Sequence, residues 1–405
     1  MSLSHMPRGS SQSDMRRANL TALLQRVRST GPSRVTDLAD SLQLSRPTVS
    51  QLVDALVQDG LLEYVEEAAG PGPRMGRPAR LVRFRAEHGY VVGIDVGPHR
   101  AVVLVADLLG STVARWGEDD HQLSEADLAV RVVARLYDLL RQTGIESHDV
   151  RAIAVAHPGL VGPSPAGARL DSLACRWSPT DLIRRLQALF TCPLLTDNDA
   201  NLAVLGESRR GAGREMNTVV YVHWGSRIGA GLLINGTLHR GAHGGAGEIG
   251  YLLPFDATDA PPVGSGAPGG FEEAVSASAI AAQGQEAARM GQLRVGQPSD
   301  DVGAAAVFTA ARDGDQTAAR IRDVAIQHFS TGLAAITLFL DPDIIVLGGG
   351  VILGFPDLVQ AIRDQLGERS LTTPKLALSA LQNEAAAVGA VCFALDAAEA
   401  YLLPG

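Results

Sequence analysis

Near its N-terminus the chain places apolar residues at helical spacing in three short segments. Each segment keeps Leu, Val or Ala on one face and polar residues on the other, which is the pattern of an amphipathic helix that packs on a small core. The predicted helices span residues 16–28, 35–42 and 46–59. Gly31 and Gly60 follow the first and third helices as stop signals. Ser45, just before Arg46 and Pro47, is a favourable N-cap for the third helix.

After the third segment the hydrophobic period changes from helical to alternating. Residues 61–65 and 81–85 alternate as half-buried strands do, and the Gly- and Pro-rich stretch 70–78 between them cannot be helical. Three helices with a tight turn before the third, followed by such a hairpin, describe a winged helix-turn-helix DNA-binding domain. We assign it residues 14–88, after a polar, disordered lead-in over residues 1–13.

The third helix of such a domain enters the major groove, with its first residues on the base edges. The expected DNA-contacting side chains are Ser45, Arg46, Thr48, Ser50, Gln51, Arg74 and Arg77. Arg pairs with guanine and Gln with adenine, and arginines on a wing tip can enter a narrow minor groove. Two plainer interpretations stay open: solvated polar residues on the helix, and a linker whose arginines keep it soluble.

A different pattern starts at residue 90. Residues 90–95 form an apolar strand, a turn follows at Gly97, and residues 100–107 form a second strand. In sugar kinases a hairpin turn of this kind wraps the phosphates of ATP with backbone N–H groups, and it needs small residues. Here Pro98 removes one donor and His99 adds bulk. The turn therefore predicts a damaged phosphate cradle.

Several motifs follow in a fixed order. They are Thr196-Asp197-Asn198-Asp199-Ala200-Asn201, Gly225-Ser226-Arg227-Ile228-Gly229, Gly244-Gly245-Ala246-Gly247-Glu248-Ile249-Gly250 and Gly348-Gly349-Gly350. Behind a helix-turn-helix, this succession closely resembles the ROK family of repressors, open reading frames and kinases. The resemblance implies an α/β fold: a winged helix-turn-helix followed by a two-lobed, actin-like ATPase fold of the sugar kinase or hexokinase type. Lobe 1 would span residues 89–200 plus a C-terminal helix near 385–402. Lobe 2 would span residues 201–384 and carry an effector site and an oligomer interface.

The resemblance also implies roles for cleft residues. In the family's kinases, the residue that matches Asp199 is the general base for a sugar hydroxyl. The expected effector-binding residues are Asn198, Asp199, Glu248, Tyr251 and Glu272. Two plainer alternatives stay open: Asp199 as a helix N-cap, and Glu248 as a loop carboxylate that caps a helix.

The chain departs from the family pattern at three places. Tyr251 stands where the family has a zinc-binding His, and the following stretch 254–270 lacks the family's cysteines, so we expect no zinc. Pro98 and His99 alter the first phosphate turn, and Arg227 replaces a glycine of the second. We expect no bound ATP and only vestigial phosphate turns, at Asp95, Gly97, Gly225, Arg227 and Gly229.

Composition limits the remaining choices. The net charge is −9, but residues 1–88 carry 12 Arg against 9 acidic residues, which suits local contact with DNA by the first domain. Cys175, Cys192 and Cys392 are scattered, which argues against a disulfide framework. No apolar run reaches about 18 residues, so we expect a cytoplasmic protein without a membrane span.

The sequence therefore predicts a DNA-binding transcriptional regulator, a repressor rather than an activator. Its partners would be double-stranded operator DNA, a sugar or sugar derivative in the cleft, and further copies of itself in a homodimer or homotetramer. Two alternatives stay open. One is an active ATP-dependent sugar kinase with Asp199 as its base, and the other is a DNA-binding protein without a small-molecule ligand.

Overall fold

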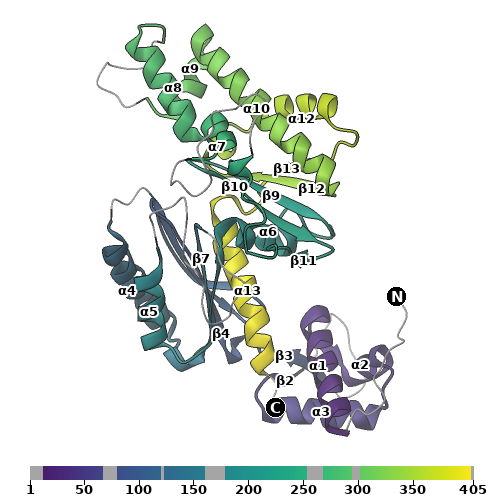
Figure 1. Cartoon of the computed structure of the whole chain (residues 1–405). Coiled ribbons are helices and arrows are strands. Elements are labelled where there is room, and N and C mark those ends of the chain that lie inside the picture. The colour runs from purple at the N-terminus through teal and green to yellow at the C-terminus, as the bar shows by residue number, and fades with distance from the viewer. Residues whose placement is uncertain are drawn as a thin grey trace, which may run out of the picture.

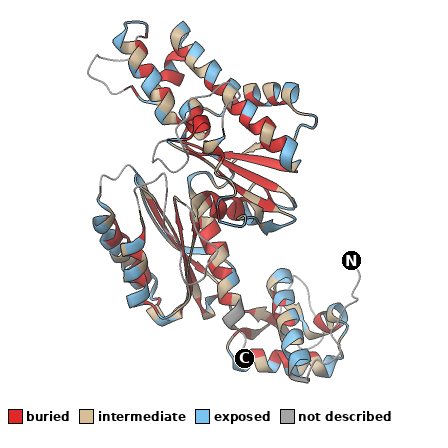
Figure 2. Cartoon of the chain, in the orientation of Figure 1, coloured by how far each residue is buried: buried red, intermediate tan, exposed pale blue. Residues whose placement is uncertain are grey.

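The computed structural model describes residues 12–66, 80–119, 123–159, 178–252, 268–293 and 302–402. They form a helical head and two lobes, each lobe built around a five-stranded sheet (Figure 1). The strands at the centre of both sheets are buried, whereas the outer faces of the flanking helices are exposed (Figure 2). The winged helix-turn-helix and the two-lobed α/β body expected from the sequence are both present.

The head consists of three helices and a small sheet in the order β1-β3-β2. Its elements are α1 (Gln12–Thr30), β1 (Ser33–Arg34), α2 (Val35–Leu42), α3 (Arg46–Gln58), β2 (Leu62–Glu66) and β3 (Arg80–Phe84). Gln43 ends α2 in the left-handed region at φ 55°, which makes the turn before α3 tight. The Ser45 hydroxyl accepts a hydrogen bond from the backbone N–H of Thr48, so the predicted N-cap of α3 is formed.

Lobe 1 contains a mixed sheet in the order β6-β5-β4-β7-β8. Its strands are β4 (Tyr90–Val96), β5 (Arg100–Asp107), β6 (Thr112–Asp119), β7 (Val150–His157) and β8 (Leu194–Asn198). Helices α4 (Glu125–Thr143) and α5 (Thr180–Leu189) pack on one face, and α13 (Ala385–Leu402) packs on the other. Short 3-10 turns lie at η1 (Ala86–His88) and η2 (Ser147–Asp149). Successive residues of β4 point to opposite faces of the sheet: Val91 lies in the core under α13, and Val92 lies in the core under α4 and α5.

Lobe 2 contains a sheet in the order β11-β10-β9-β12-β13. Its strands are β9 (Val219–Trp224), β10 (Ile228–Ile234), β11 (Thr237–Leu238), β12 (Ile344–Gly348) and β13 (Lys375–Leu378). Helix α6 (Asp199–Arg210) covers the face that looks toward lobe 1. The opposite face carries α7 (Gly270–Val275), α8 (Ala277–Arg289), α9 (Ala304–Arg312), α10 (Gln316–Leu340), α11 (Gly350–Gly354) and α12 (Leu358–Arg369). The 3-10 turns are η3 (Ile249–Tyr251) and η4 (Gln382–Glu384).

Helix α10 is long and apolar enough to span a membrane, judged by length and composition alone. Half of that apolar window is buried, and Ile326, Phe329 and Leu333 lie in the core of lobe 2. Among the described residues no other helix meets the same two criteria. Core packing accounts for the apolar character of α10.

The two lobes meet through α6 and α13, which lie side by side (Figure 1). A Cβ atom at Gly389 of α13 would lie 1.7 Å from the carbonyl oxygen of Leu202 in α6. A Cβ atom at Gly206 would lie 2.5 Å from the carbonyl oxygen of Ala385. Only glycine permits this approach of two helix backbones, so these two positions fix how α6 lies on α13.

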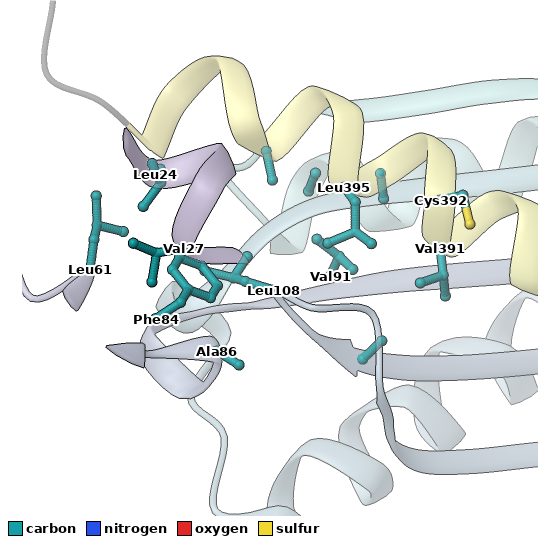
Figure 3. Close-up of a cluster of buried hydrophobic side chains, with 14 of the residues drawn as sticks. Leu24, Val27, Leu61, Phe84, Ala86, Val91, Leu108, Val391, Cys392 and Leu395 are labelled. Carbon is teal, nitrogen blue, oxygen red and sulfur yellow. The ribbon is translucent and has the colours of Figure 1, made fainter. Parts of the chain in front are cut away.

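The head shares a continuous apolar core with lobe 1. Figure 3 shows Leu24, Val27, Leu61 and Phe84 of the head beside Leu108, Val91 and Leu395 of lobe 1. Arg28 strengthens this contact: its guanidinium donates to the Leu108 carbonyl oxygen at 3.0 Å and pairs with Glu399 of α13 at 3.2 Å. The head is therefore packed on the body and is not joined to it by a linker alone.

Glu207, near the C-terminal end of α6, is 0% exposed and joins α6 to the segment that precedes α13. One carboxylate oxygen accepts from the Ser379 hydroxyl at 2.5 Å and the Leu381 N–H at 3.0 Å. The other accepts from the Ala212 N–H at 2.7 Å and the Ala380 N–H at 3.4 Å. Both oxygens of this carboxylate accept hydrogen bonds, and these bonds hold together the region where the lobes join.

We expect Glu207→Ala to lower the free energy of unfolding by about 3 kcal/mol, because it leaves several buried donors without an acceptor. Urea denaturation measures this change. Glu368→Ala, on the exposed face of α12, is the matched control and should change stability by no more than about 0.5 kcal/mol. A loss equal to that of the control would contradict the structural role of Glu207.

Candidate effector cleft and DNA-binding surface

A cavity of about 500 Å³ lies between the lobes. Five chain segments line it: the β4–β5 turn, the end of β7, the start of α6, the β9–β10 turn and the loop before η3. Four of the five predicted effector-binding residues, Asn198, Asp199, Glu248 and Tyr251, are in its wall. The cavity therefore gathers side chains that are far apart in the sequence, and its size suits a small ligand.

Asn198 and Asp199 stand at the N-terminus of α6. The Asn198 side-chain oxygen accepts from the backbone N–H groups of Ala200 at 2.9 Å and Asn201 at 3.2 Å. Asn198 is thus the N-cap, the role that we had considered for Asp199. Its amide nitrogen also donates to the Gly159 carbonyl oxygen at 3.1 Å. Asp199 is the first residue of the helix and its carboxylate borders the cavity.

Glu248 and Tyr251 enter the cavity wall from η3. Gly247, just before Glu248, has φ 91°, and a Cβ atom there would lie 1.9 Å from the Ala230 carbonyl oxygen. Only glycine fits this turn, which places Glu248 opposite the start of α6. Burial raises the pKa of Glu248, and the nearby carboxylate of Asp199 raises it further. Burial also raises the pKa of Tyr251.

Glu272 does not line the cavity, in contrast to our expectation. It is buried in α7, where one oxygen accepts from the Ile228 N–H at 3.2 Å and the other pairs with Arg227 at 3.3 Å. Both oxygens therefore face the β9–β10 turn. Within the described residues, Glu272 supports that turn and the side chain of Arg227.

In the two turns that the sequence predicted to be vestigial phosphate turns, several backbone N–H groups bond within the protein. In the β4–β5 turn, the Gly97 N–H donates to the Arg100 carbonyl oxygen at 2.8 Å, and Pro98 has no N–H to donate. In the β9–β10 turn, the Gly225 N–H donates to the Arg227 carbonyl oxygen at 3.1 Å. Since the Ile228 N–H is already bound to Glu272, neither turn keeps its full set of donors for a phosphate.

His223 is a cleft residue that sequence reasoning missed. It is the last residue but one of β9, and a Cβ atom built on Gly225 would lie 2.6 Å from its Nε2 atom. The imidazole therefore covers the second vestigial turn. Its place directly before the glycine turn, one strand period after Tyr221, was the signal available in the sequence. The His223 side chain is exposed within the 500 Å³ cavity.

Asp95 and Arg100 complete this part of the cleft. Both border the 500 Å³ cavity and a second cavity of about 680 Å³ on the side of α9 and α11. Burial raises the pKa of Asp95 to about 7, the carboxylate of Asp199 adds to the rise, and the guanidinium of Arg100 opposes it. Arg100 was not among the predicted site residues, because nothing in its local sequence distinguishes it from a strand arginine.

The predicted DNA-contacting residues lie around the start of α3. Arg46 and Gln51 are exposed, and Ser50 is partly exposed. The hydroxyls of Ser45 and Thr48 lie 2.7 Å apart and share a hydrogen bond in the helix cap, so Arg46 and Gln51 have the better access to base edges. Arg74 and Arg77, at the expected wing tip, lie outside the described residues.

Comparison with known proteins agrees with both halves of this architecture. Residues 91–397 match the family model described as the ROK family, and residues 13–70 match the one described as the MarR family. The chain belongs to the ROK family. A protein named xylose repressor from Caldicellulosiruptor bescii is 22% identical over 89% of this chain and 91% of its own length.

The solved structures that share this fold include a transcriptional regulator and a glucokinase. A ROK family transcriptional regulator, described as a homologue of the Escherichia coli MLC protein, has a TM-score of 0.75 and 19% identity over 96% of this chain and 98% of its own. A ROK family glucokinase from Streptomyces griseus, in complex with glucose and AMPPNP, has a TM-score of 0.64 and 24% identity. It covers 76% of this chain and 100% of its own. The regulator fold thus includes the head, whereas the glucokinase leaves about a quarter of this ROK chain unmatched.

The zinc expectation stays a prediction. Within the described parts of this ROK chain, no three His, Cys, Asp or Glu residues come together as a possible metal site. The stretch 254–270, where the family has its cysteines, falls mostly outside those parts.

The raised pKa of Asp95 generates a testable pH dependence. The unfolded chain releases this proton near pH 4 and the folded protein near pH 7, so the stabilisation from Asp95 is present at low pH and is lost as the pH rises through about 7. We expect Asp95→Asn to raise the thermal midpoint relative to wild type more at about pH 8.5 than at about pH 5. Asp313→Asn, an exposed position at the C-terminal end of α9, is the control. An Asp95→Asn effect that is the same at both pH values would contradict the assignment.

Proposed function

We propose that this protein is a sugar-responsive, DNA-binding transcriptional repressor. One observation carries the proposal: a winged helix-turn-helix shares its core with a two-lobed body whose cleft keeps carboxylates, while several backbone donors of its two turns already bond within the protein. The effector is a sugar or sugar derivative bound among Asn198, Asp199, Glu248 and Tyr251. Xylose appears in the name of a relative and is not assigned to this chain. The proposal here is limited to the class of sugars and sugar derivatives.

The same cleft argues against an active kinase. Phosphoryl transfer needs backbone donors and cations that are preorganised around the γ-phosphate. Here Pro98 lacks a donor, His223 covers the second turn, and Arg227 occupies a position that a phosphate turn leaves to glycine. We therefore propose that the protein transfers no phosphoryl group and needs neither ATP nor zinc. The observation that favours the kinase alternative is the retained carboxylate of Asp199.

Helix α6 offers a physical link from the cleft to the head. Its N-terminus bears Asp199, and its C-terminus, 11 residues later and about 16 Å away, bears Arg210. Arg210 donates to the Leu109 carbonyl oxygen at 2.6 Å, and the neighbouring Leu108 carbonyl accepts from Arg28 of the head. A ligand that shifts α6 would therefore move the surface on which the head rests, and with it the operator affinity.

The repressor would act in the cytoplasm as a homodimer or homotetramer on a two-fold symmetric operator. Helix-turn-helix proteins reach two half-sites about one helical turn apart, or a multiple of that, through two copies of the head. A change in head spacing on effector binding would then decide whether both half-sites can be held.

Fluorescence anisotropy and thermal-shift measurements test this function together. We expect a duplex from upstream of the protein's own gene to bind at least about 10³-fold more tightly than a scrambled duplex at about 0.15 M salt. One sugar in a panel of pentoses, hexoses, amino sugars and their phosphates should raise the thermal midpoint and weaken that binding. Asp199→Asn should lose the sugar response and keep the DNA affinity.

The outcomes separate the alternatives. A complete lack of preference between the duplexes would rule out the repressor. Robust ATP-dependent sugar phosphorylation that Asp199→Asn abolishes would establish the kinase instead. Specific DNA binding with no sugar response across the panel would favour the ligand-independent alternative.

The proposed role of α6 is tested by Arg210→Ala. We expect the variant to bind the operator and the sugar separately as wild type does. The sugar-induced loss of operator affinity should shrink by about fivefold, because one contact along the coupling route is gone. Arg214→Ala, four residues later and exposed, is the matched control. Unchanged coupling in Arg210→Ala would exclude this route.

A further inference from the structure

Three side chains connect the recognition helix to the base of the wing. Asp54 lies on α3, three residues after Gln51, and both are exposed on that helix. Its carboxylate accepts a hydrogen bond from the Tyr64 hydroxyl of β2 at 2.9 Å. The guanidinium of Arg80, the first residue of β3, stacks on the Tyr64 ring at 3.9 Å from its centre.

The strand register explains why Arg80 meets Tyr64. Tyr64 pairs with Val82, and Arg80 is the next residue of β3 on the same face of the hairpin. A diagonal neighbour at this spacing is within reach of a long side chain. Leu62, two residues before Tyr64 and on the same face of β2, is buried in the head core together with residues of α3. The hairpin is therefore packed on α3. The stack is thus held by the sheet on one side and by the recognition helix on the other.

Charge distinguishes Arg80 from the next arginine along its strand. Arg83 pairs with both Glu63 and Glu87, so carboxylates of the head compensate its positive charge. Arg80 is exposed and, within the part of the chain that the structure describes, forms no ion pair with a carboxylate. A stacked guanidinium keeps its outer N–H donors available, and its planar donor set suits a phosphate.

We propose that Arg80 binds a phosphate of the operator backbone between the major-groove helix and the wing, with Tyr64 as the residue that positions it. Asp54 anchors Tyr64 through its hydroxyl and fixes the distance from this phosphate contact to the base-reading residues Arg46 and Gln51. The contact sets the register of α3 on the duplex and carries no sequence preference of its own. This inference rests on the proposed DNA-binding function and adds residues that were not among the DNA-contacting side chains predicted above.

The test measures affinity against salt concentration by fluorescence anisotropy, with the full-length protein and the duplex of highest affinity selected from a random library. We expect Arg80→Ala to weaken binding by about fivefold on both the selected and a scrambled duplex, and to lower the slope of log K against log salt by about 0.9. Arg83→Ala, on the same strand but internally paired, is the matched control and should leave the slope unchanged.

Variants of Tyr64 separate positioning from simple folding. Tyr64→Leu removes the ring and should reproduce the slope change of Arg80→Ala, and the double variant should show no further loss. Thermal midpoints are measured in parallel, because a purely structural defect lowers the midpoint and leaves the slope unchanged.

Three results would overturn the inference. One is a wild-type salt slope in Arg80→Ala. Another is a loss confined to the selected duplex, which would mean a base contact rather than a phosphate contact. A wild-type protein that prefers no duplex would remove the proposed function itself, whereas specific wild-type binding with an unchanged Arg80→Ala slope would remove only this assignment.

Discussion

The arrangement of the molecule depends on how closely α6 and α13 approach each other between the two sheets. Gly389 and Gly206 bring the helix backbones into direct contact, and any side chain at either position would separate the lobes. This contact places the N-terminus of α6 in the cleft and its C-terminus beside the turn that supports the head. The C-terminal end of α13 reaches the same place, where Glu399 meets Arg28. Ligand site and DNA-reading domain are therefore attached to one rigid pair of helices.

Two features of the cleft support the proposal that it binds a ligand and does not transfer a phosphoryl group. The carboxylates of Asp199 and Glu248 border the cavity and can accept hydrogen bonds from sugar hydroxyls, which are neutral donors. Three backbone N–H groups of the two turns, those of Gly97, Gly225 and Ile228, already bond within the protein, and Arg227 is paired with Glu272. Binding needs complementarity to the ground state alone, whereas catalysis needs donors aimed at developing charge.

Individual residues show how far sequence reasoning reached within the site. The helices and the hairpin of the head follow from local periodicity, and the Ser45 cap is formed as expected. Asn198 was expected to bind the ligand; it lines the cavity, and it also caps α6 and bonds to Gly159. Glu272 had the same assignment, but it supports a turn of another strand pair. Motif resemblance located both residues correctly near the cleft, but only the fold shows which of their atoms are already bonded.

The sequence by itself determined the elements and their order, because helical and strand periodicity, caps and glycine turns act over a few residues. It also determined the family, through motifs that stand in a fixed succession. Only the tertiary structure decided what meets across the cleft and at the head. The Ile228 N–H on Glu272, Arg80 on Tyr64, and the glycine contact of α6 with α13 join residues from separate elements. Such contacts depend on strand register and helix packing, which no local pattern specifies.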